Sequence, residues 1–378
     1  MKLLHMSDLH LGRRFYNLSF LSLQKDILQD VLQCIDTHGI TTVLLSGDIY
    51  DKPVPPAEAV TLFDWFLTQL AERDLTVCMI SGNHDSPERL QFGSGLLQKN
   101  RIHIAGAFQG TLHTVTLSDA YGDLQIAMLP YVKPVQLAAC YPEQSFTTLT
   151  EGIQYVLHQT PPDPNCRIIL LYHGFVLHNG TMPDESESEI QLGGMQLVND
   201  DIFQDYDYVA LGHIHKPQWV QKNRIRYSGS LMKYSFSECL QHKSVTILDM
   251  QEKGNCTVTT VPLTAKQDMR IIHGPCKELL EHAVPSEDFI RAELTDLELI
   301  PNAIEKLRAV YPNLLELAYV EREQNRQPAA ATEAAHVPEQ SLMELLVEFY
   351  QNVYHYDLLE KPEQFALLER LLEEEELA

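Results

Sequence analysis

The sequence has few of the features that mark secreted or membrane proteins. Its seven cysteines are an odd number and form no C-x-x-C pair, which argues against a disulfide framework and against a thiolate zinc site. No stretch approaches about 18 uninterrupted apolar residues, and His5 and Asp8 interrupt the first segment before the apolar region of a signal peptide could form. We therefore predict a cytoplasmic protein that has no membrane partner.

Positive charge is also scarce. The chain has 28 Lys and Arg residues against 52 Asp and Glu residues, which leaves a formal net charge of −24. Because such a molecule repels polyanions on average, a protein that coats nucleic acid through a general basic surface is excluded. The 378 residues, of which 44% are hydrophobic, are enough for a large core and for two domains or more.

The first half of the chain alternates short apolar runs with amphipathic helical patterns, which predicts an α/β fold. Five apolar runs are expected to be buried strands: residues 3–4, 43–45, 77–80, 168–171 and 208–211. Apolar residues recur at helical spacing over 23–35 and over 60–70, as in helices that cover a sheet. Residues 217–273 then change to strand after strand, and we expect these strands to form a second sheet layer.

A main domain is expected over residues 1–274, and the residues after it divide into three further parts. Residues 275–322 alternate helix and strand patterns and predict a small α/β domain. Residues 323–340 hold almost no large apolar side chain and predict a flexible linker. Residues 341–378 begin with a capping box and carry apolar stripes, which predicts a helical tail suited to binding a partner.

Candidate metal ligands follow each of the five apolar runs. Because ligands bind at the carboxyl ends of strands in α/β sheets, we expect these side chains to converge on one site at one sheet edge. The clusters are Asp8 with His10, Asp48, Asn83 with His84 and Asp85, His173, and His213 with His215.

The residue types suit a pair of divalent cations. Carboxylate, amide oxygen and imidazole together favour Mn²⁺, Fe²⁺ or Zn²⁺ over Ca²⁺. A carboxylate such as that of Asp48 can bridge two ions about 3.5–4 Å apart. Two such ions are suited to phosphoester hydrolysis, because they activate water for in-line attack and neutralise the phosphoryl oxygens.

The order of these motifs, D-x-H, G-D-x-x-D, G-N-H-D, a single H and G-H-x-H, closely resembles the calcineurin-like metallophosphoesterase superfamily. The resemblance implies a β-sandwich flanked by helices. It also implies one cation held by Asp8, His10, Asp48 and His215, and a second held by Asp48, Asn83, His173 and His213. His84 would protonate the leaving oxygen, and Asp85 would orient His84.

Within that superfamily, the chain is similar to the family of nuclease subunits of SbcCD DNA-processing complexes. The similarity is carried by MKLLHMSDLHLGR at the start, G-D-I-Y-D, G-N-H-D-S, G-H-I-H-K-P and Tyr227-Ser228-Gly229-Ser230. It implies that residues 275–322 are a capping domain, and that residues 341–378 dock on SbcC, a coiled-coil ATPase related to SMC proteins.

The activity that this similarity implies is cleavage of DNA by a homodimeric nuclease subunit that uses two divalent cations, with Mn²⁺ as the expected metal. Such an enzyme is a 3′ to 5′ exonuclease on duplex DNA and an endonuclease on single strands and hairpins. It acts together with the SbcC ATPase in DNA repair, recombination and replication.

Three points stay open at the level of sequence. Another phosphodiesterase of the same fold, acting on nucleotides or phosphoproteins, would share the metal ligands. A scaffold that has lost catalysis would keep the fold, although here no ligand is missing. Asp51 either touches a cation or supports the turn that carries Asp48, and it is left out of the predicted ligands.

Overall fold

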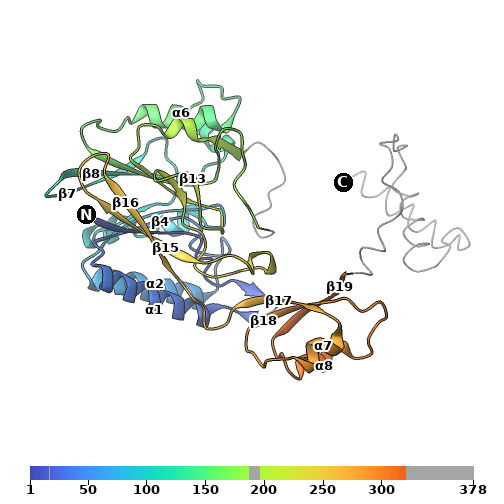
Figure 1. Ribbon diagram of the computed structural model, residues 1–378. Helices are drawn as coiled ribbons and strands as arrows, with labels where there is room; N and C mark the ends of the chain where they lie inside the picture. Colours follow the sequence, from blue (N-terminus) through green and yellow to red (C-terminus); the bar gives the residue numbers. More distant parts are fainter. Residues whose placement is uncertain (17, 187–195, 321–378) are drawn as a thin grey trace, which may run out of the picture. The chain divides into compact units, whose positions relative to one another are not determined.

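Two six-stranded sheets form the larger part of the protein. The computed structural model describes residues 1–16, 18–186 and 196–320 (Figure 1). The strand order of the first sheet is β16 (Cys256–Pro262), β15 (Ser244–Met250), β1 (Lys2–Met6), β4 (Thr42–Ser46), β5 (Thr76–Ile80) and β6 (Ile102–Ala105). The order of the second is β13 (Gln218–Gln221), β14 (Ile225–Tyr227), β12 (Tyr208–Gly212), β9 (Arg167–His173), β8 (Gly122–Leu129) and β7 (His113–Asp119).

The two sheets pack face to face, with helices on their outer faces. Leu3 of β1 and Leu44 of β4 lie in the core between the sheets, together with Ile169 of β9. Leu4, the next residue along β1, and Val43, the residue before Leu44, instead face the helices. This alternation follows from the two-residue period of a strand, and it explains why these central strands are apolar on both faces.

Each sheet has its own helical cover. Helices α1 (Leu21–His38) and α2 (Ala57–Glu72) pack on the first sheet, and α5 (Pro134–Cys140) and α6 (Leu149–Gln159) pack on the second. The expected β-sandwich flanked by helices is therefore confirmed. No helix in the described ranges has the length and apolar character needed to cross a membrane.

The strands over residues 217–273 do not form one layer together, because they divide among three sheets, so that expectation is wrong. β13 and β14 extend the second sheet, whereas β15 and β16 extend the first, with β15 antiparallel to β1. Without these strands, β1 would be an unpaired edge of the first sheet and β12 an unpaired edge of the second. The added strands supply hydrogen-bond partners to these two edges. The local strand pattern predicts the strands but not the edge that each one joins.

A small sheet with two helices follows the sandwich. Strands β17 (Met269–Gly274), β18 (Phe289–Leu294) and β19 (Leu314–Tyr319) are parallel, and α7 (Cys276–Glu281) and α8 (Ala303–Arg308) connect them. The small α/β unit therefore starts at Met269, whereas the sequence pattern starts it at residue 275. The predicted linker 323–340 and tail 341–378 lie outside the described residues.

Short elements make up the remaining connections. They are β2 (Arg14–Phe15), β3 (Leu18–Ser19), β10 (Phe175–Leu177), β11 (Leu197–Asn199), α3 (Pro87–Gln91), α4 (Ser94–Leu97) and the 3₁₀ turns η1 (Gln98–Asn100), η3 (Asp200–Phe203) and η4 (Phe236–Glu238).

The topology brings the motif-bearing strands together in two groups. β1, β4 and β5 are parallel neighbours in the first sheet, and β9 and β12 are parallel neighbours in the second. The predicted ligands follow the carboxyl ends of these strands. They therefore come from two facing sheets, and the expectation of a single sheet edge is wrong.

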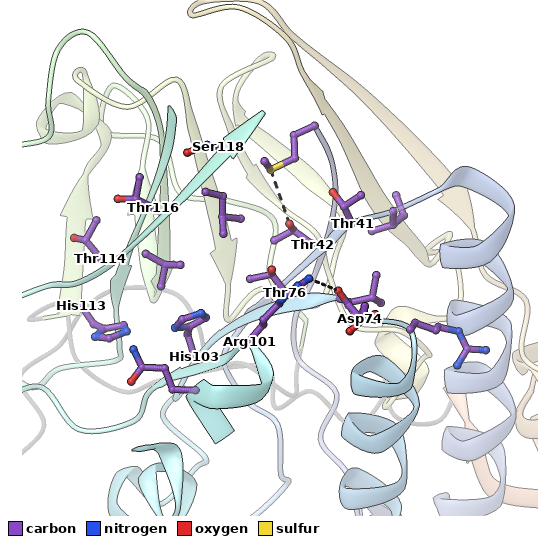
Figure 2. Close-up of a pocket in the computed structure, with 17 residues that line it drawn as sticks. Thr41, Thr42, Asp74, Thr76, Arg101, His103, His113, Thr114, Thr116 and Ser118 are labelled. Atoms are coloured by element: carbon purple, nitrogen blue, oxygen red, sulfur yellow. Dashed lines mark hydrogen bonds between the residues drawn. The ribbon is translucent and has the colours of Figure 1, made fainter. Parts of the chain in front are cut away.

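The opposite end of the sandwich holds a cavity of about 640 Å³. Thr42 and Thr76, the first residues of β4 and β5, line it together with His103 and His113 (Figure 2). None of the predicted metal ligands lines this cavity. Its position at the amino ends of the strands separates it from the chemistry at their carboxyl ends.

One buried histidine gives the sandwich a defined response to pH. His5 lies between the sheets, with Nδ1 3.1 Å from the Tyr208 hydroxyl and Nε2 3.1 Å from the Leu211 carbonyl oxygen. Since a carbonyl oxygen only accepts, Nε2 carries the proton and Nδ1 accepts from Tyr208. Burial, aided by the charge of Arg226, lowers the pKa of His5 to about 3.

We predict that His5 lowers the free energy of unfolding as the pH falls from 6.5 towards 3. In this pH range His5 is protonated in the unfolded chain but neutral in the folded protein. The free energy of unfolding therefore falls by up to about 1.4 kcal/mol per pH unit. Urea unfolding at pH 7.5 and at pH 5 measures the effect. The His5→Asn variant should lose less stability between the two pH values than the unmodified protein, and an equal loss in both would contradict the assignment.

Candidate metal centre

The loops that carry the ligands have unusual backbone conformations. Asp8, Asp48 and His213 have φ angles of 53°, 50° and 109°, in a region that residues other than glycine rarely adopt. The loops after β1 and β4 hold each other in place, because the Asp8 amide donates to the Gly47 carbonyl and the His10 amide donates to the Asp48 carbonyl. Strained residues of this kind persist only where surrounding contacts over-determine them, and they cluster at functional sites.

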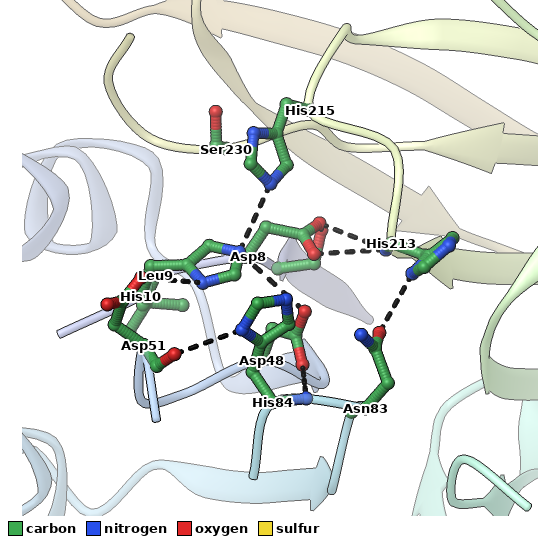
Figure 3. Close-up of polar contacts among 12 residues, drawn as sticks. Asp8, Leu9, His10, Asp48, Asp51, Asn83, His84, His213, His215 and Ser230 are labelled. Carbon is green, nitrogen blue, oxygen red and sulfur yellow. Dashed lines mark hydrogen bonds and ion pairs between the residues drawn. The ribbon is translucent and has the colours of Figure 1, made fainter. Parts of the chain in front are cut away.

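One group of candidate ligands consists of Asp8, His10 and His215. The Nε2 atoms of His10 and His215 are 3.1 Å apart, and all three side chains are buried. The Asp8 carboxylate accepts the backbone N–H of His213 at 3.0 Å and is therefore fixed against the loop after β12. Figure 3 shows these side chains directed towards a common space.

A second group consists of Asp48, Asn83, His173 and His213. The amide oxygen of Asn83 lies 3.0 Å from Nε2 of His173 and 2.9 Å from Nδ1 of His213. Oδ2 of Asp48 lies 3.4 Å from the same Nε2 of His173. Oxygen and nitrogen donors from different motifs thus meet within the reach of one cation.

Asp48 belongs to both groups. Its Oδ2 lies 3.6 Å from Nε2 of His10 and 3.4 Å from Nε2 of His173. Its Oδ1 accepts the backbone N–H of His84 at 2.9 Å, which fixes the rotation of the carboxylate. Oδ2 therefore cannot rotate away from either group. This one oxygen lies between the two sets of candidate ligands.

Hydrogen bonds set the tautomers of two histidines. Nδ1 of His173 is 2.8 Å from the Ser46 carbonyl oxygen, and Nδ1 of His84 is 2.9 Å from the Asp51 carbonyl oxygen. Because carbonyl oxygens only accept, both Nδ1 atoms carry protons. Nε2 of His173 therefore faces Asp48 and Asn83, and it presents a lone pair there when the ring carries a single proton, as a metal ligand must.

The buried ionisable groups have pKa values that depend on their burial and on one another. Burial raises the pKa of Asp8 and holds the pKa values of His10 and His213 well below their usual range. Burial also opposes ionisation of Asp48, but the charge and hydrogen bond of His173 outweigh it and lower the pKa of Asp48. Burial opposes protonation of His173 as well, yet Asp48 raises the pKa of His173 to about 9.

The residues fit a pair of divalent transition-metal cations. Three sets of side chains place potential ligand atoms within 4.8 Å of one another: Asp8, His10 and His215; His10, Asp48 and His84; and Asp48, His173 and His213. Mixed carboxylate, amide and imidazole donors suit Mn²⁺, Fe²⁺ and Zn²⁺. Nε2 of His213 is buried and makes no hydrogen bond to any part of the chain that the structure describes, which is rare for a histidine that only packs.

Asp85 contacts the backbone instead of His84, which differs from the role that the resemblance implies. Its Oδ2 accepts the N–H groups of Gly82 at 2.9 Å and Ile49 at 3.1 Å, and its Oδ1 accepts that of Tyr50 at 2.9 Å. Burial and the nearby charge of Asp48 raise the pKa of Asp85 to about 6. Asp85 therefore ties the third motif loop to the second, and the Asp51 carbonyl orients the ring of His84.

Asp51 also supports the loops. Its carboxylate pairs with Nη1 of Arg13 at 2.8 Å and lies 3.7 Å from Nδ1 of His10. The backbone of Asp51 holds His84, as described above. Of the two interpretations left open by the sequence, these contacts favour the supporting one.

Glycines determine how closely the motif loops approach one another, and the motif spacing alone does not predict this role. A Cβ atom on Gly82 would lie 2.1 Å from Oδ1 of Asp48, and one on Gly47 would lie 2.4 Å from Nδ1 of His173. A Cβ atom on Gly212 would lie 2.0 Å from the Ser46 carbonyl oxygen. The available signal is that each of these glycines directly precedes a ligand.

Comparison with known proteins identifies the family of the chain. A family model for calcineurin-like phosphoesterases matches residues 1–217, and the chain belongs to that family. A second model, described as the type 5 capsule protein repressor C-terminal domain, matches residues 265–354. The family predicted from the motifs is therefore confirmed.

More specific relatives are named as the SbcD subunit of the nuclease SbcCD. The protein of that name from Staphylococcus epidermidis is 28% identical over 324 residues, which cover 85% of this chain and 86% of the relative. That from Staphylococcus saprophyticus is 27% identical over 321 residues, which cover 84% of each. A solved dimetal phosphatase from Danio rerio has a TM-score of 0.40 at 12% identity, covering 70% of this chain and 99% of that one.

The Gly82→Ala variant should bind Mn²⁺ at least about 10-fold more weakly, because the added methyl group displaces the Asp48 carboxylate shared by both ligand groups. Isothermal titration calorimetry measures the affinity. Gly95→Ala is the matched control, because a Cβ atom there meets nothing within 4 Å. Equal affinity in the two variants would show that the close approach at Gly82 does not position Asp48.

Proposed function

We propose that this protein is a nuclease subunit that hydrolyses DNA phosphodiesters with two divalent cations. The observation that carries the proposal is the position of Asp48 Oδ2, 3.6 Å from a histidine nitrogen of one ligand group and 3.4 Å from a histidine nitrogen of the other. The two staphylococcal relatives, both named as part of the nuclease SbcCD, support DNA as the substrate.

In this proposal, Asp8, His10, Asp48 and His215 hold one cation, and Asp48, Asn83, His173 and His213 hold the other. Mn²⁺ is the proposed metal, as the similarity to the SbcCD nuclease subunits implies, and the mixed oxygen and imidazole donors suit it as they suit Fe²⁺ and Zn²⁺. When bound, the pair supplies Lewis acidity that activates water and neutralises charge on the phosphoryl group.

The chain itself supplies a proton donor and a rigid frame. The Asp51 carbonyl fixes the Nδ1 proton of His84, so His84 exchanges protons through Nε2. The ring of His84 packs edge-on against His10, with centroids 4.8 Å apart, and is therefore next to the ligands. We assign His84 as the general acid that protonates the leaving oxygen, and Asp85 as the residue that holds its loop.

A phosphodiesterase that acts on nucleotides or phosphoproteins is the second candidate. It would need the same ligands, so the metal centre does not separate the two. The match of residues 265–354 to a second domain model favours the nuclease, because hydrolysis of a small diester does not require such a domain. A scaffold without catalysis is disfavoured, since no proposed ligand is replaced.

A substrate comparison tests the proposal. With Mn²⁺, the full chain should cleave linear duplex or single-stranded DNA, in the presence of its ATPase partner where duplex ends are used. Bis-p-nitrophenyl phosphate and cyclic AMP serve as small diester substrates. Hydrolysis of the small diesters with no cleavage of DNA, even when the ATPase is present, would favour the second candidate.

In the same assay, the His84→Gln variant should cleave DNA about 10²–10⁴-fold more slowly, because a general acid contributes a factor of that size. Mn²⁺ affinity and DNA binding should stay unchanged, because His84 is outside the proposed ligand set. Turnover equal to that of the unmodified protein would refute the assigned role.

We further propose that residues 341–378 bind SbcC, the coiled-coil ATPase of the complex for which the relatives are named. These residues lie outside the described part of the chain, and the proposal rests on their apolar stripes and on the relatives. Deletion of residues 339–378 should abolish co-purification with the ATPase and preserve Mn²⁺-dependent cleavage of single strands. Retained co-purification would place the contact elsewhere.

We also propose a homodimer located in the cytoplasm. We keep the predicted main domain and capping domain, residues 1–274 and 275–322, but move the boundary between them to Met269, because β17 pairs with β18 in the small sheet. Phe92 follows α3 and is 87% exposed, and Leu96 lies in α4 and is 71% exposed. Together they supply an apolar surface for the proposed dimer, close to the motif that carries His84.

All seven cysteines are free thiols, which supports the proposed location in a reducing compartment.

A further inference from the structure

We propose that Glu238 and Lys243 form a buried ion pair that positions His215 for cation binding. The inference rests on the metal centre proposed above, and it assigns two residues that the motifs do not include. Glu238 ends the short turn η4, and Lys243 precedes β15. Both side chains are almost inaccessible, at 0% and 4% exposure. Carboxylates and ammonium groups are seldom buried to this extent unless they are paired.

The two carboxylate oxygens of Glu238 have different partners. Oε1 lies 3.2 Å from Nδ1 of His215, and Oε2 lies 2.7 Å from Nζ of Lys243. Because the ionised carboxylate only accepts, Nδ1 of His215 carries the proton. Nε2 of the neutral ring is then the lone-pair nitrogen, and it is the atom that lies 3.1 Å from Nε2 of His10.

Lys243 secures the backbone of the same histidine. Its Nζ donates to the carbonyl oxygen of His215 at 2.8 Å and to the hydroxyl of Ser230 at 2.8 Å. The amide of Ser230 donates to the same His215 carbonyl. The side chain of His215 is therefore held by Glu238 and its backbone by Lys243, while the two holding groups neutralise each other.

This arrangement differs from the support of the other ligand group. His173 is oriented by a backbone carbonyl, that of Ser46, which no substitution removes. His215 is oriented by a side chain, which can be exchanged. A buried ion pair by itself is weak evidence of stabilisation, because an apolar pair of similar volume is often as stable. Here the charged groups contact the side chain and the backbone of a proposed ligand, so we assign the pair a positioning role and not a stabilising one.

Two double variants test the inference without leaving a buried charge unpaired. Glu238→Leu with Lys243→Met removes the acceptor for Nδ1 of His215. Glu238→Gln with Lys243→Met is equally uncharged but keeps an amide oxygen that can accept this proton. Electron paramagnetic resonance of free Mn²⁺ gives the number and affinity of the sites, and thermal unfolding without added metal shows that both variants fold.

The Leu/Met variant, Glu238→Leu with Lys243→Met, should bind one of two Mn²⁺ ions about 10–100-fold more weakly. The reason is that the loss of a hydrogen-bond partner behind a ligand has an effect of that size. The second ion should bind as in the unmodified protein, and the Gln/Met variant should recover most of the loss. Two unchanged sites in the Leu/Met variant, or equal losses in both variants, would overturn the positioning role while the proposed function stands. Absence of Mn²⁺ binding in the unmodified protein would overturn both.

Discussion

The shared carboxylate of Asp48 is the constraint on which the other features of the site depend. One oxygen must approach histidines from two different sheets, since His10 follows β1 and His173 ends β9. The backbone N–H of His84 holds the other oxygen and prevents rotation. The sandwich therefore has to keep the loops of two sheets in register with one another to within a fraction of an ångström.

That requirement explains where the backbone is strained and where glycine occurs. Asp8, Asp48 and His213 adopt positive φ angles, at a cost of order 1–3 kcal/mol each. The nearby glycines at 47, 82 and 212 have no room for a side chain. Apolar packing between the sheets and under the helices offsets these costs, since the strands that lead into the loops are buried along their whole length, as β4, β5 and β9 show.

Local patterns in the sequence predict strands and candidate ligands more directly than they predict which strands pair. Short apolar runs followed by Asp, Asn and His are local patterns, and they identify both the strands and the side chains that meet. The sheet that each strand joins depends on edges distant in the chain, which explains why β15 and β16 extend the first sheet. The contacts of Asp85 show the same limit, because neighbouring residues in a tight loop can point in different directions, here towards backbone amides of the second motif loop.

Residues that support the ligands from behind are the hardest to predict, because they have no fixed spacing from the motifs. Tyr234 is an example: its hydroxyl donates to the Leu9 carbonyl, and its ring lies 5.6 Å from His10 and 5.8 Å from His215 between centroids. Phe20 stacks on Tyr234 and also contacts Phe289 of β18. Packing is thus continuous from the small sheet to two of the proposed metal ligands. A change in the packing at Phe289 would reach the rings of His10 and His215 through two intervening rings, those of Phe20 and Tyr234, because close-packed interiors transmit displacement instead of absorbing it.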